Sequence, residues 1–193
     1  ETARLQSENI FSLLLKRFGE RQAYQAFRGK VIDAKFWEPY PFSLQIPDTF
    51  RLYSNDKTGR FLSFLYRARI PNREIPDKYI SVYYEDMPEN KVDADWLFNK
   101  RQELWQARFE GDTIKKDNIR SEAFKFAGYQ GFRISGPWEN QKLIIGGACQ
   151  TMAFWHPGTK RAYLIDNSVF FPAGDKLAIL LELHMISSTL KIK

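Results

Sequence analysis

The sequence predicts an α+β fold in which an antiparallel sheet is covered by helices, with a helical lead-in at the N-terminal end. Two observations predict this class. Apolar residues alternate with period two in several short segments, which is typical of half-buried strands. Helical spacing occurs at the two ends of the chain and once between the strand groups, so the helices are segregated from the strands. We expect residues 1–41 to form the lead-in and residues 42–193 the sheet domain.

The first forty residues have a mostly helical pattern. The apolar residues at helical spacing are Phe11, Leu14, Leu15 and Phe18. Ser7 is a candidate helix cap, and Gly19 is a point where the helix bends or divides. Trp37–Pro41 then ends the helical segment, because residues before proline avoid the α region.

Strands are predicted from Phe42 onward. Phe42, Leu44 and Ile46 alternate with polar residues, as on a strand with one buried face. Further strand candidates before the second helix are Phe50–Tyr53, Phe61–Tyr66 and Tyr79–Tyr84. A turn at Asn55–Gly59 and a loop at Pro71–Pro76 separate them.

A second helix is predicted over Asp93–Arg108, with Asp93 as its cap and Gly111 as its stop. Arg101 and Arg108 fall within its apolar stripe. We expect their aliphatic stems to pack on the core while their charged groups reach water.

Four more strands and a helix complete the prediction. The strand candidates are Ala123–Phe126, Gln130–Trp138, Gly147–His156 and Lys160–Phe171. Pro157-Gly158-Thr159 forms a hairpin turn between the last two. The final helix extends from Asp175 to about Ser188, and its predicted apolar face consists of Leu177, Leu180, Leu181 and His184.

Composition excludes several classes of protein. The chain has 193 residues and a formal charge of +6, in short charge clusters that indicate a solvated surface rather than an interaction tail. Cys149 is the only cysteine, which excludes an intramolecular disulfide and a multi-thiolate zinc site. No stretch approaches the roughly 20 apolar residues of a membrane span.

Several motifs resemble a known family. They are Phe42–Pro47 opening the sheet, Gly136–Glu139 and Gly146-Gly147 after the second helix, and Tyr163–Pro172 before a helical tail at Lys176–Ile192. They resemble a family of uncharacterised lipoproteins of the Gram-negative cell envelope, a domain of unknown function. The element order is also similar to the fold of the photosystem extrinsic protein P and the Ran-binding Mog-one proteins, which bind and organise partners.

The resemblance implies a periplasmic or membrane-tethered protein of the cell envelope whose partner is a protein, glycan or lipid. In that family, tethering comes from a lipid anchor on an N-terminal cysteine. This chain begins at Glu1, and Cys149 lies in a predicted strand far inside it. We therefore expect membrane contact only through an anchor that this chain lacks.

Enzyme signatures are absent from the sequence, so no catalytic residue, metal site or cofactor is predicted. Gly146-Gly147 indicates a bulge or a close backbone approach rather than a dinucleotide site. His184 is expected to be a buried or boundary imidazole, and Cys149 a buried thiol. The clusters at Glu85–Glu89 and Asp93–Asp95 are explained by loop solvation and by the helix dipole.

The sequence thus predicts a non-catalytic binding or scaffold protein of the cell envelope. Two alternatives remain open, an enzyme with an unfamiliar site and a nucleic-acid-binding domain. The second rests on Phe64, Tyr66, Arg67 and Arg69, which combine rings with cations on one predicted strand. However, Arg67 and Arg69 on one face and Tyr66 and Ala68 on the other also fit an ordinary sheet with one wet face.

A partner-binding surface is predicted at Trp138, Trp155 and His156. All three lie near strand ends or turns, where rigid aromatic residues are often exposed and anchor partners. The competing interpretation is that both tryptophans close the core of the sheet.

Overall fold

The computed structural model describes residues 2–193, the side chains of residues 2–5, 8 and 12 excepted. Its helices are α1 (Thr2–Ala26), α2 (Ala94–Arg108) and α3 (Leu177–Ser187). Short 3₁₀ helices lie at Ala34–Trp37, Glu89–Lys91 and Lys116–Asn118. The strands are β1 (Phe42–Ser43), β2 (Arg51–Asp56), β3 (Phe61–Tyr66), β4 (Asp77–Asp86), β5 (Thr113–Ile114), β6 (Arg120–Phe126), β7 (Tyr129–Asn140), β8 (Ile145–His156), β9 (Arg161–Phe170) and β10 (Lys191–Ile192).

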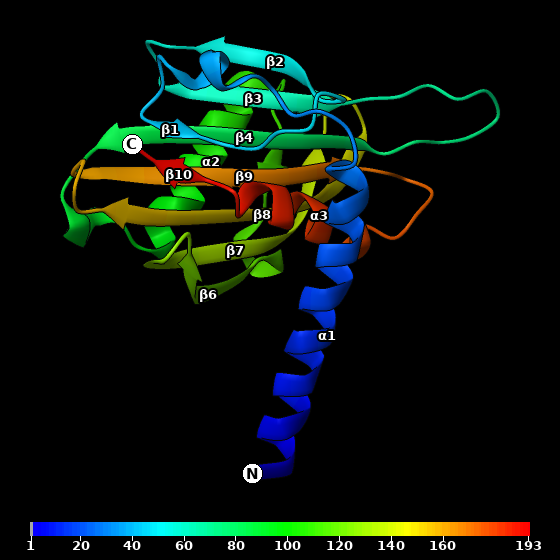
Figure 1. Ribbon diagram of the computed structural model, residues 1–193, viewed down its shortest axis with the longest axis horizontal. Helices are drawn as coiled ribbons and strands as arrows, with labels where there is room; N and C mark the ends of the chain where they lie inside the picture. The colour runs from blue at the N-terminus through cyan, green and yellow to red at the C-terminus, as the bar shows by residue number, and fades with distance from the viewer. Residues whose placement is uncertain (1) are drawn as a thin grey trace.

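One large sheet dominates the molecule, and every strand pair in it is antiparallel. The order is β2-β3-β4-β9-β8-β7-β5, and β6 pairs with another part of β7 (Figure 1). A separate two-stranded sheet joins β1 to β10 near the two ends of the folded domain. The predicted α+β fold with an antiparallel sheet under helices is therefore confirmed.

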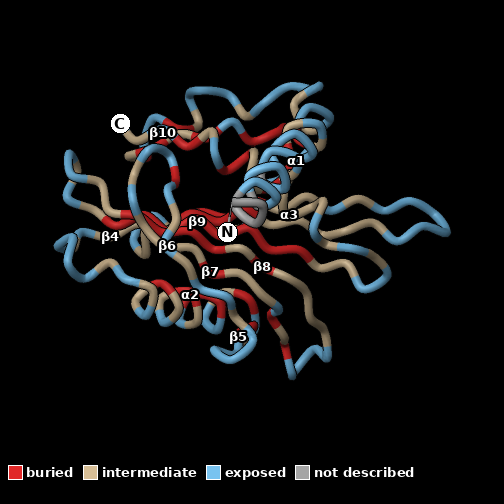
Figure 2. Tube along the Cα trace, turned by 90° about the horizontal axis from the view of Figure 1, so that it is seen from below, coloured by how far each residue is buried: buried red, intermediate tan, exposed pale blue. Residues whose placement is uncertain are grey.

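Helices cover both faces of this sheet. Figure 2 shows α2 on one side and α3, with the end of α1, on the other. Two clusters of buried apolar residues correspond to the two faces: Leu183 and Ile186 of α3 belong to one, and Leu97 and Leu104 of α2 belong to the other. Strand β9 lies between these clusters and is covered on both faces. This explains why all residues of Ala162–Val169 are buried.

Helix α2 begins and ends as the sequence predicts. The carboxylate of Asp93 accepts a hydrogen bond of 2.7 Å from the backbone N–H of Trp96, so Asp93 is its N-cap. After the helix, Glu110 and Gly111 both have positive φ, and the value of 100° at Gly111 favours glycine. This turn brings Asp112 back beneath the end of the helix, where its N–H bonds to the carbonyl of Phe109.

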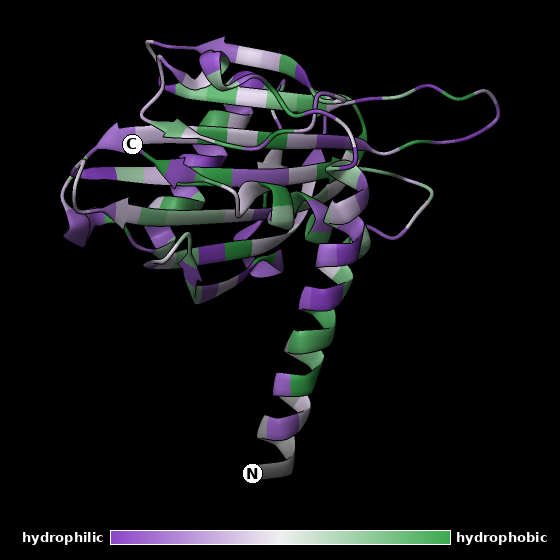
Figure 3. Ribbon diagram, in the orientation of Figure 1, coloured by the Kyte–Doolittle hydropathy of each residue, from purple (hydrophilic) through white to green (hydrophobic). Residues whose placement is uncertain are grey.

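Helix α1 differs from the prediction in three respects. It begins at Thr2, so Ser7 lies inside it and is not a cap. It continues through Gly19 without dividing, and Gly19 packs against Met185 and Leu181 of α3. It ends at Ala26, so the residues up to Trp37 are not one helical segment. Its N-terminal half extends away from the sheet (Figure 1), and this helix carries several exposed apolar residues, which are coloured green in Figure 3.

The buried face of α3 was predicted wrongly. Leu183 and Ile186 point into the core, whereas Leu177 is half exposed. Helix α1 packs through Gly19 against Leu181 and Met185 of α3, so part of the apolar surface of α3 meets α1 rather than the sheet. The expected strand at Phe42–Ile46 pairs only at Phe42 and Ser43, although its predicted alternation of buried residues holds.

Strand β3 ends at Tyr66, before the two arginines that the sequence analysis placed on it. Arg67 instead turns to Asp77 at the start of β4 and forms an ion pair with it. The chain leaves the sheet here because the loop containing Pro71 and Pro76 begins within a few residues.

Candidate functional site

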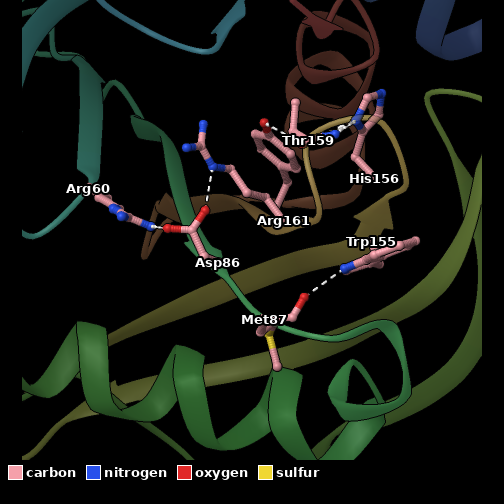
Figure 4. A network of polar contacts seen from close by, with 8 residues as sticks. Arg60, Asp86, Met87, Trp155, His156, Thr159 and Arg161 are labelled. Atoms are coloured by element: carbon pink, nitrogen blue, oxygen red, sulfur yellow. Dashed lines mark hydrogen bonds and ion pairs between the residues drawn. The ribbon is translucent and has the colours of Figure 1, made fainter.

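Trp155 and His156 lie at the end of β8, in the polar network of Figure 4. The indole Nε1 of Trp155 donates to the carbonyl of Met87 at 2.8 Å, and the backbone N–H of Thr159 donates to Nδ1 of His156 at 3.1 Å. Both side chains are partly buried. Each aromatic residue therefore has an internal partner that fixes the hairpin, although neither side chain is fully covered.

Acidic and basic groups complete this end of the sheet. Asp86 accepts a hydrogen bond from Arg161 and pairs with Arg60, and these two guanidinium groups lower the pKa of its carboxyl group. Both guanidinium groups also lie 5.8 Å from the ring centre of Tyr84. The charges here are thus paired with one another.

Trp138 lies at the opposite end of the sheet. It pairs with Gly147 at the start of β8, whereas Trp155 pairs with Ala162 near the end of β8. Only 5% of Trp138 is exposed. A Cβ atom at Gly147 would lie 2.7 Å from the indole nitrogen and 2.0 Å from the carbonyl oxygen of Val169, so the close approach predicted at the glycine pair is present. The structure does not bring Trp138 together with Trp155 and His156.

A pocket of about 300 Å³ lies beside Trp138, between the C-terminal end of α2 and the sheet. Six aromatic residues line it: Tyr53, Tyr79, Trp105, Phe109, Trp138 and Phe170. Its polar lining residues are Arg67, Asp77, Glu110, Asp112 and Ser168. Aromatic walls combined with a few polar groups are typical of small-molecule sites.

The aromatic wall is built from packed rings on several elements. Phe109 stacks on Trp105 with a centroid distance of 5.2 Å and on Tyr53 at 5.5 Å, and Tyr79 meets its edge at 5.5 Å. These contacts join β2, β4 and the end of α2. The wall is therefore held in place before any ligand arrives.

A buried ion pair lies behind this pocket. Arg101 of α2 and Asp166 of β9 have no exposed side-chain surface, and Nε of Arg101 is 3.4 Å from Oδ1 of Asp166. The guanidinium carbon of Arg101 lies 4.9 Å from the ring centre of Trp105, which lines the pocket. The expectation that the charged group of Arg101 reaches water is wrong, because a buried carboxylate and an aromatic face receive it.

Asp166 is the centre of a row of polar residues across the sheet. Thr151 donates to Oδ1 of Asp166, and Ser168 donates to Oδ2. The row continues to Ser81 and Ser63, which are paired in register and whose hydroxyl oxygens are 2.8 Å apart. Ser168 also lines the pocket, so this buried network extends to the pocket wall.

Several buried donors of this region have no hydrogen-bond partner. They are Nε1 of Trp138 and both terminal nitrogens of Arg101. An unsatisfied buried donor costs free energy, typically about 1–3 kcal/mol. These atoms have almost no accessible surface, so they are closed off from the pocket as well as from solvent.

The polar wall of the pocket is rich in carboxylates. Asp112 is 8% exposed and accepts a hydrogen bond of 2.8 Å from Nδ2 of Asn140. Burial raises the pKa of Asp112, against the opposing effects of Asn140 and Arg101. Burial, with the charge of Asp77 nearby, raises the pKa of Tyr79 to about 12. Burial therefore disfavours the charged form of both side chains at the inner wall.

Of the other candidate residues from the sequence, Arg67 lines the pocket, whereas Cys149 and His184 lie outside it. Cys149 is fully buried in β8, as predicted, and burial raises the pKa of its thiol to about 12. His184 packs against Phe124 and Phe126 on the other face of the sheet, a boundary position as expected. Among the described residues, no three histidine, cysteine or acidic side chains gather as a metal site. No helix in the described part of the chain is long and apolar enough to cross a membrane.

Sequence reasoning missed this pocket because its lining comes from β2, β4, α2, β7, β8 and β9. Two signals of the buried network were nevertheless visible. One was a charged residue, Arg101, in an apolar helical stripe, and the other was the polar run Asp166-Asn167-Ser168 within an otherwise apolar strand. A charge in each of two buried elements indicates a pair between them.

The family is shown by sequence comparison. The model of a domain of unknown function, DUF4837, matches residues 30–189. The chain therefore belongs to this family, which confirms its resemblance to a domain of unknown function. No curated protein matches the chain.

Solved structures show a similar fold at low identity. The Ran-binding protein Mog1p of Saccharomyces cerevisiae is 12% identical, with a TM-score of 0.52, over 79% of this chain and 90% of that chain. A point mutant of Mog1 is 13% identical, with a TM-score of 0.51, over 86% and 96%. LpqN of Mycobacterium tuberculosis, described as involved in cell envelope biogenesis, is 14% identical, with a TM-score of 0.42, over 79% and 83%. The expected similarity to the Mog-one fold is confirmed.

Proposed function

We propose that this protein is a non-catalytic binding protein of the cell envelope, and that its ligand site is the aromatic pocket beside Trp138. The observation that favours this function is the packed aromatic wall of the pocket, with the carboxylate of Asp112 among its lining residues. Such a wall offers a large apolar area with few side-chain torsions to freeze on binding.

The absence of catalysis is part of the proposal. The lining residues of the pocket include neither of the two histidines nor the cysteine. The carboxylates that line the pocket are those of Asp77, Glu110 and Asp112. Asp77 is engaged by Arg67, while Asp112 accepts from Asn140. These contacts support a role for Asp77 and Asp112 in holding the wall in place, as in a binding site.

A fragment screen followed by NMR tests the pocket. The readout is the set of indole N–H signals from Trp37, Trp96, Trp105, Trp138 and Trp155. Binders should shift the signals of Trp105 and Trp138 and leave that of Trp155 unchanged. Binders that move only the Trp155 signal would place the ligand at the opposite end of the sheet and refute this assignment.

A pair of tyrosine variants controls the screen. Tyr53→Ala removes a half-exposed ring of the pocket wall, and Tyr24→Ala removes an exposed ring on α1. The first variant should weaken binding and the second should not. Turnover of a bound compound by the wild-type protein would argue for the alternative of an enzyme with an unfamiliar site.

The envelope location rests on the sequence motifs that resemble envelope lipoproteins. It is tested by fractionating cells that produce the protein at its native level. Recovery in the envelope or periplasmic fraction is expected, and recovery with the cytosolic marker would contradict the location while leaving the pocket untouched.

A further inference from the structure

Strand β2 forms an open edge of the large sheet (Figure 1). It stands last in the strand order and pairs only with β3. Among the described residues, the backbone of Arg51–Asp56 has no hydrogen-bond partner outside this ladder. Because an antiparallel strand directs N–H and C=O groups to both sides, the outer groups of β2 are free to pair with another chain.

A groove of about 520 Å³ lies beside this open edge. Its lining residues come from β2 and from the end of β3 with the loop that follows: Arg51, Leu52, Tyr53, Leu65, Arg67 and Arg69. Half of them are arginines, and none is acidic. Leu52 is 47% exposed, so an apolar surface accompanies the positive charge.

Two of the three arginines are unpaired. Arg67 forms an ion pair with Asp77. Arg51 and Arg69 are exposed and have no hydrogen bond or ion pair with any described residue. A guanidinium group binds carboxylates well through its fork of N–H donors. The groove thus offers two free cationic sites for a partner with negative charge.

The opposite edge of the sheet lacks this charge pattern. On β6 and its neighbour β7, Arg120 and Arg133 both pair with Glu122. Lys125 is exposed and unpaired on β6, but it stands alone. The two open edges therefore differ in their unpaired arginines, which are a property of the β2 edge.

A nucleic acid fits this surface less well than a peptide does, because few rings are free to stack on bases. Of the rings that the sequence combined with arginines, Phe64 is fully buried and Tyr66 carries the ammonium group of Lys78 at 4.8 Å from its centre. The groove has one ring, that of Tyr53, and it already stacks on Phe109.

We infer that the β2 edge binds a short, extended, acidic peptide segment of a partner protein, which pairs with β2 as an added strand and places its carboxylates against Arg51 and Arg69. Main-chain hydrogen bonds give such complexes affinity, and alternate side chains give them specificity. The register shift between Leu52 and Ser54 interrupts regular pairing, so the added segment is short.

This inference goes beyond the aromatic pocket and does not depend on it. The groove and the pocket share Tyr53 and Arg67. Arg51 and Arg69 line the groove alone, so variants at these two positions test the β2 edge without altering the pocket wall.

The test is an NMR titration of the full chain with the peptide acetyl-EVDVEV-amide. Its binding should shift the backbone amide signals of Arg51–Asp56 in a saturable manner and leave those of β6 unchanged. The basic peptide acetyl-KVKVKV-amide should not bind. The acidic peptide N-methylated at every residue keeps its charges but cannot pair as a strand, so it should not bind either.

Three charge reversals locate the contact. Arg51→Glu and Arg69→Glu should each weaken binding of the acidic peptide at least about fivefold, because each replaces an attraction by a repulsion. Lys125→Glu changes the net charge equally on β6, six strand spacings or roughly 30 Å away. It should weaken binding less than about twofold, since salt screens charges over that distance. If a glutamate variant unfolds, Arg51→Gln and Arg69→Gln remove the same charges.

Several outcomes would overturn the inference. Equal losses of affinity in all three variants would mean that net charge alone attracts the peptide. Undiminished binding of the N-methylated peptide would exclude an added strand. An oligothymidylate that shifts the same amide signals while the acidic peptide is silent would assign the edge to nucleic acid.

A second copy of the chain is the remaining occupant. Shifts of the β2 amide signals on raising the protein concentration, without peptide, would assign the edge to self-association and overturn the inference. No response to any probe would leave the arginines as protection of an open edge against aggregation. In each of these cases, fragments that shift the indole signals of Trp105 and Trp138 would still support the proposed pocket.

Discussion

At the scale of single residues, the buried pair Arg101–Asp166 is the most consequential feature. Arg101→Met fills similar space but leaves the carboxylate of Asp166 buried with hydroxyl donors alone. We expect this variant to lose about 3–5 kcal/mol of unfolding free energy, the usual cost of removing one partner of a buried pair. Urea denaturation measures it. The exposed pair Lys116–Asp95 supplies the control, since Lys116→Met should leave the urea midpoint almost unchanged.

His184 makes the stability depend on pH. Burial, with a smaller contribution from Arg133, lowers the pKa of His184 from 6.5 to about 4. Between these values the unfolded chain binds the proton and the folded chain does not, so the unfolding free energy falls as the pH drops. We expect this residue to account for a loss of about 2 kcal/mol between pH 7.5 and pH 5. Urea titrations of the wild type and His184→Gln at both pH values test it, because the variant should lack this part of the loss.

Cys149 is predicted to be poorly reactive in the folded protein. Its side chain is fully buried, and the raised pKa leaves almost no thiolate near neutral pH. A thiol reagent should label the native protein slowly and the urea-unfolded protein at once. Rapid stoichiometric labelling under native conditions would show that β8 opens locally or that the thiol is accessible.

At the scale of elements, the two terminal helices contribute unequally to stability. Leu183 of α3 is fully buried against the sheet, whereas Leu14 of α1 is 62% exposed. Leu183→Ala should therefore lower the unfolding free energy by about 2–5 kcal/mol, and Leu14→Ala should change it by less than about 0.5 kcal/mol. Thermal and urea unfolding of the two variants compares the same substitution in two helices. A large loss from Leu14→Ala would mean that the exposed face of α1 is covered in solution.

The elements themselves were largely predictable because alternation and spacing are local. The strands β3, β4, β7, β8 and β9 and the helix α2 appear within a few residues of their predicted bounds. The face of α3 was not predictable, because its apolar residues surround most of the helix and only its position between α1 and the sheet selects Leu183 and Ile186. The short strands β5 and β10 were missed, since a two-residue pairing leaves no periodic pattern.

The site was much less predictable than the fold. Trp138 was selected as a binding residue for its place near a turn, and it does line the pocket, but its companions Trp155 and His156 lie at the far end of β8. Which end of a strand meets which helix depends on the sheet order β4-β9-β8-β7, a long-range property. The role of these three residues in binding stays a prediction.

At the scale of the whole molecule, the boundary between lead-in and domain can be tested by truncation. Trp37 and Tyr40 are 3% and 7% exposed and pack with Phe42 and Phe64 in the core. The test compares the unfolding free energies of two truncated chains, one beginning at Arg28 and the other at Phe42. Both lack α1, so they differ only in residues 28–41. The shorter chain should lose at least about 3–5 kcal/mol more, the cost of removing one buried tryptophan. Identical melting transitions for the two chains would instead place the boundary at residue 41, as the sequence predicts.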